Sequence, residues 1–328
     1  MPLYKSIPIE CIEGFHIGQV THDDTGTGTT VIVAPEGATG GVDVRGGAPA
    51  SRETDLLRPE QTVDVVHAVA LSGGSAFGLE AASGVMRELA KREIGLDVGV
   101  AKVPIVCSSC IFDLAYKAAN AFPTVEDGIQ ATINAFESVG KPVATGNVGA
   151  GTGATVGKLM GPKHTMKGGL GTAAMQVGAL QVGAVVAVNA CGNVYNPTTN
   201  KPIAGMCVAK GTPILSIEEA ALNAIAGANK LGLKMPLERT NTTIACIITN
   251  APLTKAQATK VAQMAADAYA HTIRPTHTTN DGDTIYVLSR KDPHGDRDSL
   301  RSIPLDAIGI AATKTLEQAI VCGVKDAQ

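Results

Sequence analysis

The chain has 328 residues, of which 45% are apolar, and this is enough to fill the core of one large domain or two ordinary ones. Its 27 basic and 30 acidic residues give a net charge of −3, which lacks the basic excess that nucleic-acid binding requires. We therefore expect a globular, soluble protein with no nucleic-acid partner.

The first residues, 1–14, show neither the charged and apolar regions nor the small-residue cleavage site of a secretory signal. The longest apolar stretch, residues 182–188, contains Gly183 and is much shorter than the roughly 20 residues of a membrane-spanning helix. Seven scattered cysteines fit a reducing compartment better than a disulfide framework. We expect a cytoplasmic protein without a membrane partner, in which Cys107 and Cys110, a CxxC pair, are buried as small hydrophobic residues.

Predicted strands and helices alternate in the first half of the chain. In order, the pattern favours a strand at 29–33, a glycine-rich turn region at 37–47, an extended segment or a helix at 63–71, a helix from 77 to about 95 and a helix from 125 to about 140. The last of these has a clear start, because the Thr124 side chain can cap it and Asp127 follows three residues later.

The second half continues the alternation. The pattern favours nearly continuous apolar strands at 177–188, a helix from 217 to about 230, a polar connection at 231–241, a strand at 242–249, a helix from 255 to about 271, a strand at 284–289 and a helix at 305–321. Ser216 with Glu219 forms a capping box, and Thr254 caps the alanine-rich helix. No repeat or linker interrupts the chain, so we expect one domain of packed sheets and helices over residues 1–328.

The glycine-rich run at residues 146–161 resembles a phosphate loop but lacks its pattern, because Thr152 stands where that loop needs Gly and Leu159 where it needs Ser or Thr. A GxGxxA match at Gly149, Gly151 and Ala154 follows no clear buried strand and has no acidic ribose partner. A tight turn beside a site is the favoured interpretation.

Other familiar catalytic patterns are incomplete. Ser75 lies in GGSAF, close to the nucleophile elbow of α/β-hydrolases, but Phe77 occupies the position of the second glycine. The seven histidines show no metal-ligand spacing. We therefore expect no metal and no cofactor.

Two short segments remain, Asn241–Thr242–Thr243 ahead of a strand and Asp281–Gly282–Asp283 about forty residues later. Each alone is ordinary strand or turn sequence. Together they suit a chain that cuts itself: a Thr hydroxyl attacks the carbonyl before it, and water hydrolyses the resulting ester. The freed Thr would have an α-amine with a pKa of about 7.7 to 8, which can act as base for its own hydroxyl.

Several windows, spread in order over nearly the whole chain, resemble the self-processing aminopeptidases of the DmpA type, the L-aminopeptidase/D-esterase-amidases, which include β-aminopeptidases and nylon-oligomer hydrolases. The windows are GVDVRGGAP (41–49), ALSGGSAFGLEAASGV (70–85), GAGTGATVGK (149–158), NTTIACIITNAPL (241–253) and HTTNDGDTIYVLS (277–289). The nylon-hydrolase branch is especially similar around NTTI and DGDT.

The resemblance implies an α+β fold, an αββα sandwich, and cleavage between Asn241 and Thr242 into fragments 1–241 and 242–328 that stay together. It implies that Thr242 is the nucleophile and that Asn189 donates to the oxyanion. The remaining implied site residues are Lys158 in the glycine-rich loop, Asp281 and Asp283 in contact with the nucleophile, and Gly149 and Gly151 in the neighbourhood of the substrate. A homo-oligomer, with a tetramer among the allowed assemblies, would be usual.

Phe112 departs from the pattern, because many members have a Tyr there whose phenol donates a second hydrogen bond to the oxyanion. Losing such a donor costs about 2.7 to 4 kcal/mol in the barrier, so another donor substitutes or turnover is slow. We expect a hydrolase of short peptides or amino acid amides. The sequence leaves open a hydrolase of ω-amide oligomers, an acyltransferase of the same fold, and an idle binding or scaffold protein.

Overall fold

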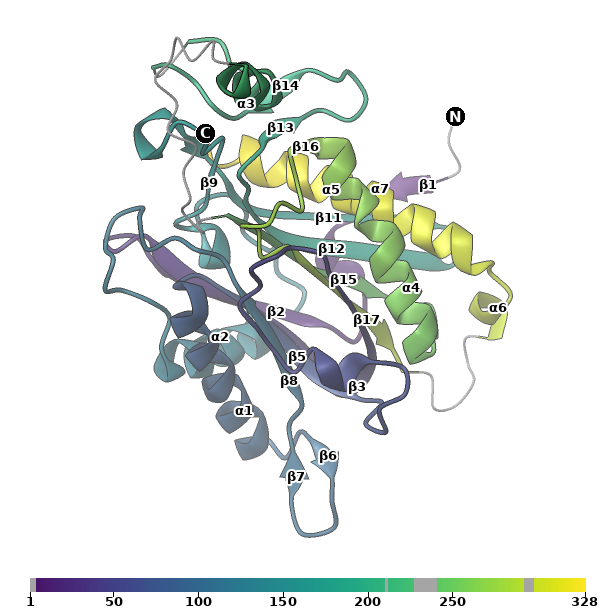
Figure 1. The fold of residues 1–328 in the computed structure, drawn as a ribbon. Coiled ribbons are helices and arrows are strands. Elements are labelled where there is room, and N and C mark those ends of the chain that lie inside the picture. Colours follow the sequence, from purple (N-terminus) through teal and green to yellow (C-terminus); the bar gives the residue numbers. More distant parts are fainter. Residues whose placement is uncertain (1–3, 210–211, 227–240, 292–297) are drawn as a thin grey trace.

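The computed structural model describes residues 4–209, 212–226, 241–291 and 298–328 (Figure 1). Among these residues, nine strands follow one hydrogen-bonded path in the order β1-β11-β12-β15-β17-β3-β5-β8-β4, and a tenth, β2, pairs with β3 off this path. Their bounds are β1 Tyr4–Ser6, β2 His16–His22, β3 Thr27–Val44, β4 Ser51–Arg52, β5 Val66–Ser72, β8 Val106–Cys110, β11 Gly169–Val177, β12 Leu180–Asn189, β15 Thr242–Thr249 and β17 Thr284–Arg290.

The long strand β3 belongs to two sheets. Its residues 38–44 pair with β17, while its residues 27–33 pair with β2 and β5, and the register shifts between Val33 and Ala38. The path therefore divides into a first sheet, with β11, β12, β15 and β17, and a second sheet, with β2, β5 and β8, which pack face to face.

Helices cover the two outer surfaces. The first sheet carries α4 Lys255–Ala265, α5 Asp267–Thr272 and α7 Leu305–Lys325, and the second carries α1 Ala81–Lys91 and α2 Val125–Glu137 (Figure 1). The molecule thus has four layers in the order helix, sheet, sheet, helix, which confirms the predicted αββα sandwich.

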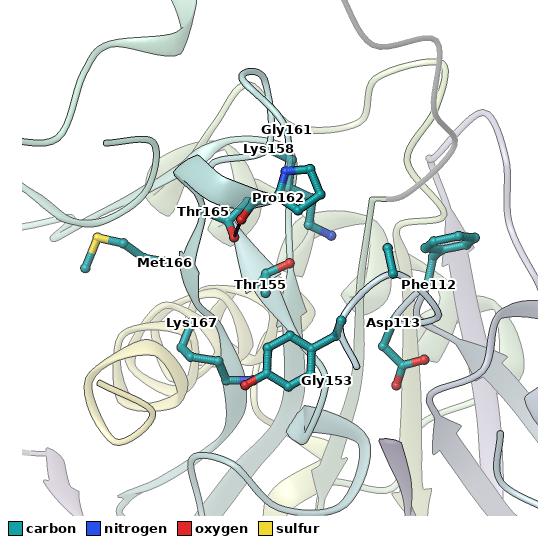
Figure 2. A pocket seen from close by; sticks show the side chains of 12 residues that line it. Phe112, Asp113, Gly153, Thr155, Lys158, Gly161, Pro162, Thr165, Met166 and Lys167 are labelled. Carbon is teal, nitrogen blue, oxygen red and sulfur yellow. Dashed lines mark hydrogen bonds between the residues drawn. The ribbon is translucent and has the colours of Figure 1, made fainter. Parts of the chain in front are cut away.

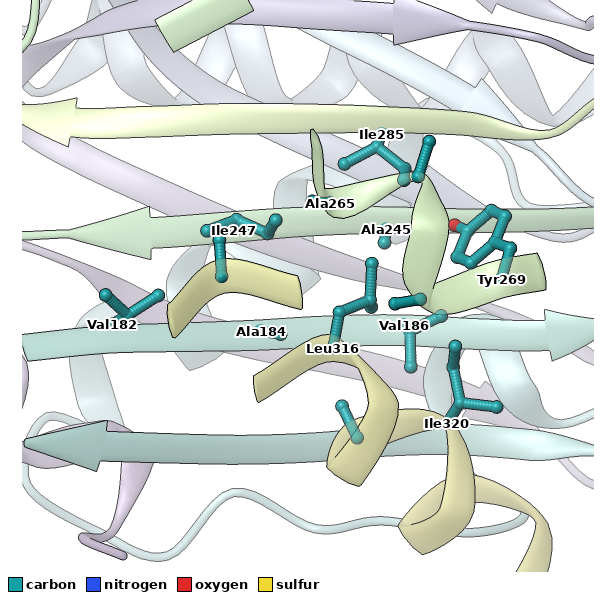
Figure 3. Packing of buried hydrophobic residues seen from close by; sticks show 14 of the residues in the cluster. Val182, Ala184, Val186, Ala245, Ile247, Ala265, Tyr269, Ile285, Leu316 and Ile320 are labelled. Carbon is teal, nitrogen blue, oxygen red and sulfur yellow. The ribbon is translucent and has the colours of Figure 1, made fainter. Parts of the chain in front are cut away.

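Along each buried strand, successive side chains enter two different hydrophobic cores. In β15, Ile244, Cys246 and Ile248 enter the core between the sheets, while Ala245 and Ile247 pack under α4, α5 and α7 (Figure 3). This is the period of two that a strand buried on both faces requires. The same alternation directs the side chain of Thr242 toward the space between the sheets, as it does that of Ile244.

The predicted glycine-rich turn at 37–47 was wrong, because β3 continues through this region to Val44. The glycines serve packing instead. A Cβ added at Gly41 would lie 2.3 Å from the Thr259 nitrogen, so helix α4 can rest on the strand only where the strand has no side chain.

Most other predicted elements are confirmed, with shifted bounds. The segment predicted at 63–71 forms strand β5 from Val66 onward and not a helix, and the segment from 75 begins as a 3-10 helix, η3 Ser75–Glu80, before α1. The capping box of Thr124 and Asp127 is present. The helix predicted from 255 to 271 is divided between α4 and α5 at Ala266.

Ser216 caps α3 Ile217–Ile225, while residues 227–230 of its predicted length and residues 231–240 of the predicted connection lie outside the described residues. Cys107 and Cys110 are buried on β8, where a spacing of three directs their thiols to opposite faces, as suits small hydrophobic residues. The remaining short elements are η1 Ile9–Cys11, η2 Asp55–Leu57, β6 Leu96–Asp97, β7 Lys102–Val103, η4 Gly149–Gly151, β9 Thr155–Val156, η5 Pro162–His164, β10 Met166–Lys167, β13 Asn193–Tyr195, β14 Pro202–Ala204, β16 Ile273–Arg274 and α6 Asp298–Arg301.

Helix α7 is long and apolar enough to cross a membrane by length and composition alone. In the structure one of its faces packs on β11 and β12, where Leu316 and Ile320 enter the core of the first sheet (Figure 3). That packing accounts for its apolar composition.

Candidate active site

Thr242 is the first residue of β15 and lies opposite Asn189, the last residue of β12. Both are buried, with 5% of Thr242 and none of Asn189 exposed. By strand alternation both side chains point between the two sheets, at the end of the sandwich. The antiparallel register therefore brings together two residues that the sequence separates by 53 positions.

The turn at residues 281–283 lies against the peptide bond between Asn241 and Thr242. Asn241 and Asp281 form a parallel bridge, and the Gly282 N–H donates to the Asn241 carbonyl at 3.0 Å. The Thr242 hydroxyl donates to the same carbonyl. A Cβ added at Gly282 would be only 2.9 Å from Thr242 Oγ1, so the turn and the hydroxyl are in close contact.

The two carboxylates of the turn hold the backbone around Thr242. Asp283 Oδ1 accepts the Thr243 N–H at 2.7 Å, and Asp283 Oδ2 accepts from Thr276 Oγ1, the His277 N–H and the His277 ring, each at 3.0 Å. Asp281 Oδ2 accepts the Thr278 N–H at 2.6 Å. The predicted pair is thus assembled at the site, with Asp283 reaching the residue after Thr242.

Burial, with the charge of Asp283 next, raises the pKa of Asp281 to about 6. Two buried carboxylates so close together resist ionising at once, and this makes a nearby cation favourable. A terminal ammonium on Thr242 would be such a cation.

Asn189 and Lys158 form the opposite side of the site. Lys158 Nζ donates to Asn189 Oδ1 at 2.7 Å and to the Asn189 carbonyl at 3.0 Å, and the Thr155 N–H donates to the same Oδ1 at 3.0 Å. Asn189 Nδ2 donates to the Phe112 carbonyl at 3.1 Å. The three contacts fix the amide plane and assign its oxygen and nitrogen ends.

Burial lowers the pKa of Lys158 to about 7. Its ammonium and neutral forms are therefore both accessible near neutrality, which is unusual for a lysine and typical of a functional site. Phe112, in contrast, contributes its backbone carbonyl to Asn189, while its ring lines the adjoining pocket.

A pocket of about 320 Å³ opens beside Lys158 (Figure 2). Its lining also includes Phe112, Asp113, Tyr116, Thr155, Met166 and Lys167. Thr242 and Asn189 are not among the lining residues, but Lys158 lines the pocket and bonds Asn189, which lies opposite Thr242. A substrate group of a few heavy atoms fits a space of this size.

Asp113 and Lys167 are charged groups of this pocket that the sequence analysis missed. Asp113 accepts from the Gly74 N–H at 2.6 Å and from Thr27 Oγ1 at 2.8 Å, and burial raises its pKa. Lys167 Nζ donates to the Thr152 and Ala154 carbonyls at 2.7 and 2.8 Å, and burial lowers its pKa to about 8. The signal for Asp113 was its position three residues after a buried strand.

His277 and Tyr269 were also missed. The Tyr269 hydroxyl donates to the Thr243 carbonyl at 3.2 Å, and its ring centroid lies 5.7 Å from that of His277. His277 lies in the window HTTNDGDT, so its spacing from Asp283 was visible, but nothing in a sequence indicates which way a loop side chain turns.

Gly149 and Gly151 lie behind the pocket, against the sheets. An added Cβ would be 2.2 Å from Thr30 Oγ1 at Gly149 and 2.0 Å from the Leu170 nitrogen at Gly151. They let the loop pack on β3 and β11, and the glycines of this run that line the pocket are Gly153 and Gly161. Within the described ranges, no group of three or more His, Cys, Asp or Glu side chains suits a metal ion.

Residues 9–328 match the family model of peptidase family S58. A protein of Mycobacterium leprae, designated an uncharacterized aminopeptidase, is 43% identical over 267 residues, which cover 80% of this chain and 70% of that protein. A 6-aminohexanoate-oligomer endohydrolase of Agromyces sp. is 28% identical over 94% of this chain and 83% of its own length.

The fold is similar to that of a solved L-aminopeptidase D-Ala-esterase/amidase from Ochrobactrum anthropi, described as a prototype of the serine aminopeptidases and a variant of the Ntn hydrolase fold. The two share a TM-score of 0.66 and 19% identity over 98% of this chain and 86% of that one. These findings confirm the resemblance that the sequence windows indicated. The chain belongs to peptidase family S58, a family of peptide- and amide-bond hydrolases, and has the Ntn hydrolase fold.

Proposed function

We propose that the chain cuts itself between Asn241 and Thr242 and that the freed Thr242 is the nucleophile of amide hydrolysis. The observation that carries this proposal is the set of contacts around the peptide bond between Asn241 and Thr242. Its carbonyl accepts from both the Thr242 hydroxyl and the Gly282 N–H, while Asn189 stands opposite on the neighbouring strand. A reactive hydroxyl, a polarised carbonyl and an amide donor thus meet within a buried site.

Processing would give Thr242 an α-amine beside its own hydroxyl. Such an amine has a pKa of about 7.7 to 8, so its neutral form can accept the hydroxyl proton as Oγ1 attacks a substrate carbonyl. The carboxylates of Asp281 and Asp283 lie close enough to hold the ammonium form that results. One residue would supply both nucleophile and base, and the reaction needs no cofactor.

Asn189 would stabilise the oxyanion. Its Nδ2 is the donor end of the amide and contacts the Phe112 carbonyl, while Lys158 on Oδ1 fixes the orientation of the amide. Attack by Oγ1 forms an ester with the substrate acyl group and releases an amine. Water then hydrolyses the ester and restores Thr242.

The substrates that suit this site are short peptides or amino acid amides, whose small residues a pocket of about 320 Å³ can hold. A second candidate, hydrolysis of ω-amide oligomers, is favoured by the similarity to the 6-aminohexanoate-oligomer endohydrolase. An acyltransferase remains the third, because an amine can replace water in releasing the ester.

Intact-mass analysis of purified protein after prolonged incubation tests the proposal. We expect two fragments that meet at Asn241 and Thr242, with N-terminal sequencing of the smaller one beginning at Thr242. A chain that stays at full length would contradict self-cleavage and favour an idle protein. A panel of small α-, β- and ω-amides, assayed with and without an added amine acceptor, then separates hydrolase from acyltransferase.

A further inference from the structure

Gly282 is held so that its N–H points at one atom. The turn that contains it is anchored on both sides, because Asp281 accepts the Thr278 N–H and Asp283 accepts the Thr243 N–H. Between these anchors the Gly282 N–H donates to the Asn241 carbonyl oxygen at 3.0 Å. A backbone donor fixed in this way needs no reorganisation when charge develops on its partner.

That oxygen is where charge develops if the chain cuts itself. Attack by Thr242 Oγ1 on the Asn241 carbonyl carbon makes the carbonyl oxygen an alkoxide. A donor at 2.7 to about 3.1 Å from the position of an oxyanion stabilises it. The Gly282 N–H meets this distance already in the uncut chain.

We propose that the backbone N–H of Gly282 is the oxyanion donor of the self-cleavage step, a role separate from that of Asn189 toward substrates. This inference rests on the proposed self-cleavage. In the step, the Oγ1–carbon bond forms and the bond from that carbon to the Thr242 nitrogen breaks. The hydroxyl proton ends on the Thr242 nitrogen as an amine, and water then converts the Asn241 ester to a carboxylic acid and returns a proton to Oγ1.

The residue type at position 282 is a second, independent observation. Gly282 is not among the glycines with positive φ, so its backbone conformation alone would admit a side chain. A side chain would crowd the Thr242 side chain first, because an added Cβ would be 2.9 Å from Thr242 Oγ1 and 3.2 Å from Thr242 Cγ2, with the Ala48 carbonyl oxygen at 3.1 Å. Glycine here lets the N–H approach the reacting peptide without pushing the hydroxyl away.

The test replaces the Gly282 N–H by oxygen, with glycolate incorporated at position 282 of the full chain in cell-free translation. The matched control has glycolate at Gly46, whose N–H donates at 3.3 Å to the carbonyl of Asp283 in the same turn and not to Asn241. Self-cleavage is followed by intact mass over time, with and without hydroxylamine, which cuts the Asn241–Thr242 ester once it has formed. Hydroxylamine also cuts the introduced glycolate ester, and those fragments are distinguished by their mass. Thermal unfolding of both chains checks that they fold.

We expect glycolate at 282 to slow cleavage about 10²- to 10³-fold. Hydroxylamine should not restore the rate, because the slowed step is the formation of the Asn241–Thr242 ester intermediate and not its hydrolysis. The ester at 46 should cleave within a few-fold of the unmodified chain. Equal rates for the two ester chains would overturn the donor role. An unmodified chain that never cleaves would instead overturn the proposed function, so the two failures are distinct.

A further measurement keeps the inference testable if the ester chain does not fold. In the uncut Thr242→Ala chain, which lacks the hydroxyl donor, infrared spectroscopy of a ¹³C=¹⁸O label on the Asn241 carbonyl reports its hydrogen bonding directly. We expect the lowered frequency of a bonded carbonyl. The frequency of an unbonded carbonyl would overturn the proposal.

Discussion

The two sides of Thr242 differ in what they contact. On the side of the turn at 281–283, most hydrogen bonds go to backbone groups, among them the Thr243 N–H, the Thr278 N–H and the Asn241 carbonyl. The side chains of Thr276 and His277 also bond Asp283. On the other side, Lys158 and Asn189 contact each other through their side chains, and Lys158 lines an open pocket. The turn side therefore mainly holds the backbone around Thr242, whereas the amide side adjoins the pocket.

This difference predicts a separation of effects. Changes on the turn side should alter both self-cleavage and hydrolysis, because both steps use Thr242. Changes on the amide side should alter hydrolysis alone. The predictions below test this separation, beginning with the residue that both sides share.

Thr242→Ala should abolish both steps, with hydrolysis falling by at least about 10⁴-fold, as loss of a nucleophile does in other hydrolases. The matched control is Thr243→Val, because Thr243 is also buried and its hydroxyl has no hydrogen-bond partner among the described residues. That variant should cleave and turn over normally. Mass spectrometry and amidase assays measure the two steps, and residual turnover by the Thr242→Ala protein would disprove the nucleophile.

Lys158→Met should lower kcat for hydrolysis about 10²- to 10³-fold, because Asn189 loses the contact that orients its amide. Self-cleavage should proceed at close to the normal rate. Lys167→Met is the control on the same pocket wall, since its ammonium bonds the Thr152 and Ala154 carbonyls and should affect KM more than kcat. Equal losses in cleavage and hydrolysis for Lys158→Met would break the proposed separation.

Asp281 gives the turn side a pH dependence. Its raised pKa of about 6 means that the carboxylate takes up a proton as the pH falls through that value, so it would no longer hold the terminal ammonium that the proposed cut creates. Hydrolysis should then decline on the acid side with an apparent pKa near 6. Asp281→Asn should lower the plateau about 10²-fold and flatten the acid limb. A wild-type profile that is level between pH 5 and 7 would rule this role out.

Substitutions of Asp113 should have the smallest effect of the four, and the effect should be on the free energy of unfolding. Asp113→Ala leaves the buried Gly74 N–H without its acceptor and should cost about 1 to 3 kcal/mol of unfolding free energy. Asp113→Asn keeps an acceptor and should lose about 1 kcal/mol or less. Because burial raises the wild-type pKa, ionisation destabilises the wild-type fold as pH rises, so the Asn variant should gain relative to wild type between pH 4 and 7. Thermal and denaturant unfolding at the two pH values measure this.

Much of the fold followed from the sequence, because period-two and capping patterns are local. The start of α2 at Thr124 and the strand at residues 242–249 are examples. The course of β3 was missed because a glycine in a sequence shows that the backbone could turn, but not whether it does. Whether Gly41 ends a strand or admits a helix depends on α4, which is more than 200 residues away.

The site divides in the same way. Motif and resemblance led to Thr242, Asn189, Lys158, Asp281 and Asp283, and the structure brings these five together. Asp113, Lys167 and His277 were missed, because the position of Asp113 after a strand and of His277 near Asp283 does not reveal burial or partners distant in the chain, such as Thr27 for Asp113. A single sequence does not encode those pairings in any local pattern.

The strand order β12-β15-β17-β3 bears on reversibility. A cut before Thr242 would place β15 and β17 on one polypeptide and the flanking strands β12 and β3 on the other. The smaller piece would then supply the middle of the sheet and the larger piece both of its sides. The uncut chain refolds as one molecule, at a rate independent of concentration. The cut protein would have to find its partner again after unfolding, so dilution would trap it unfolded, and maturation would make assembly a one-time event.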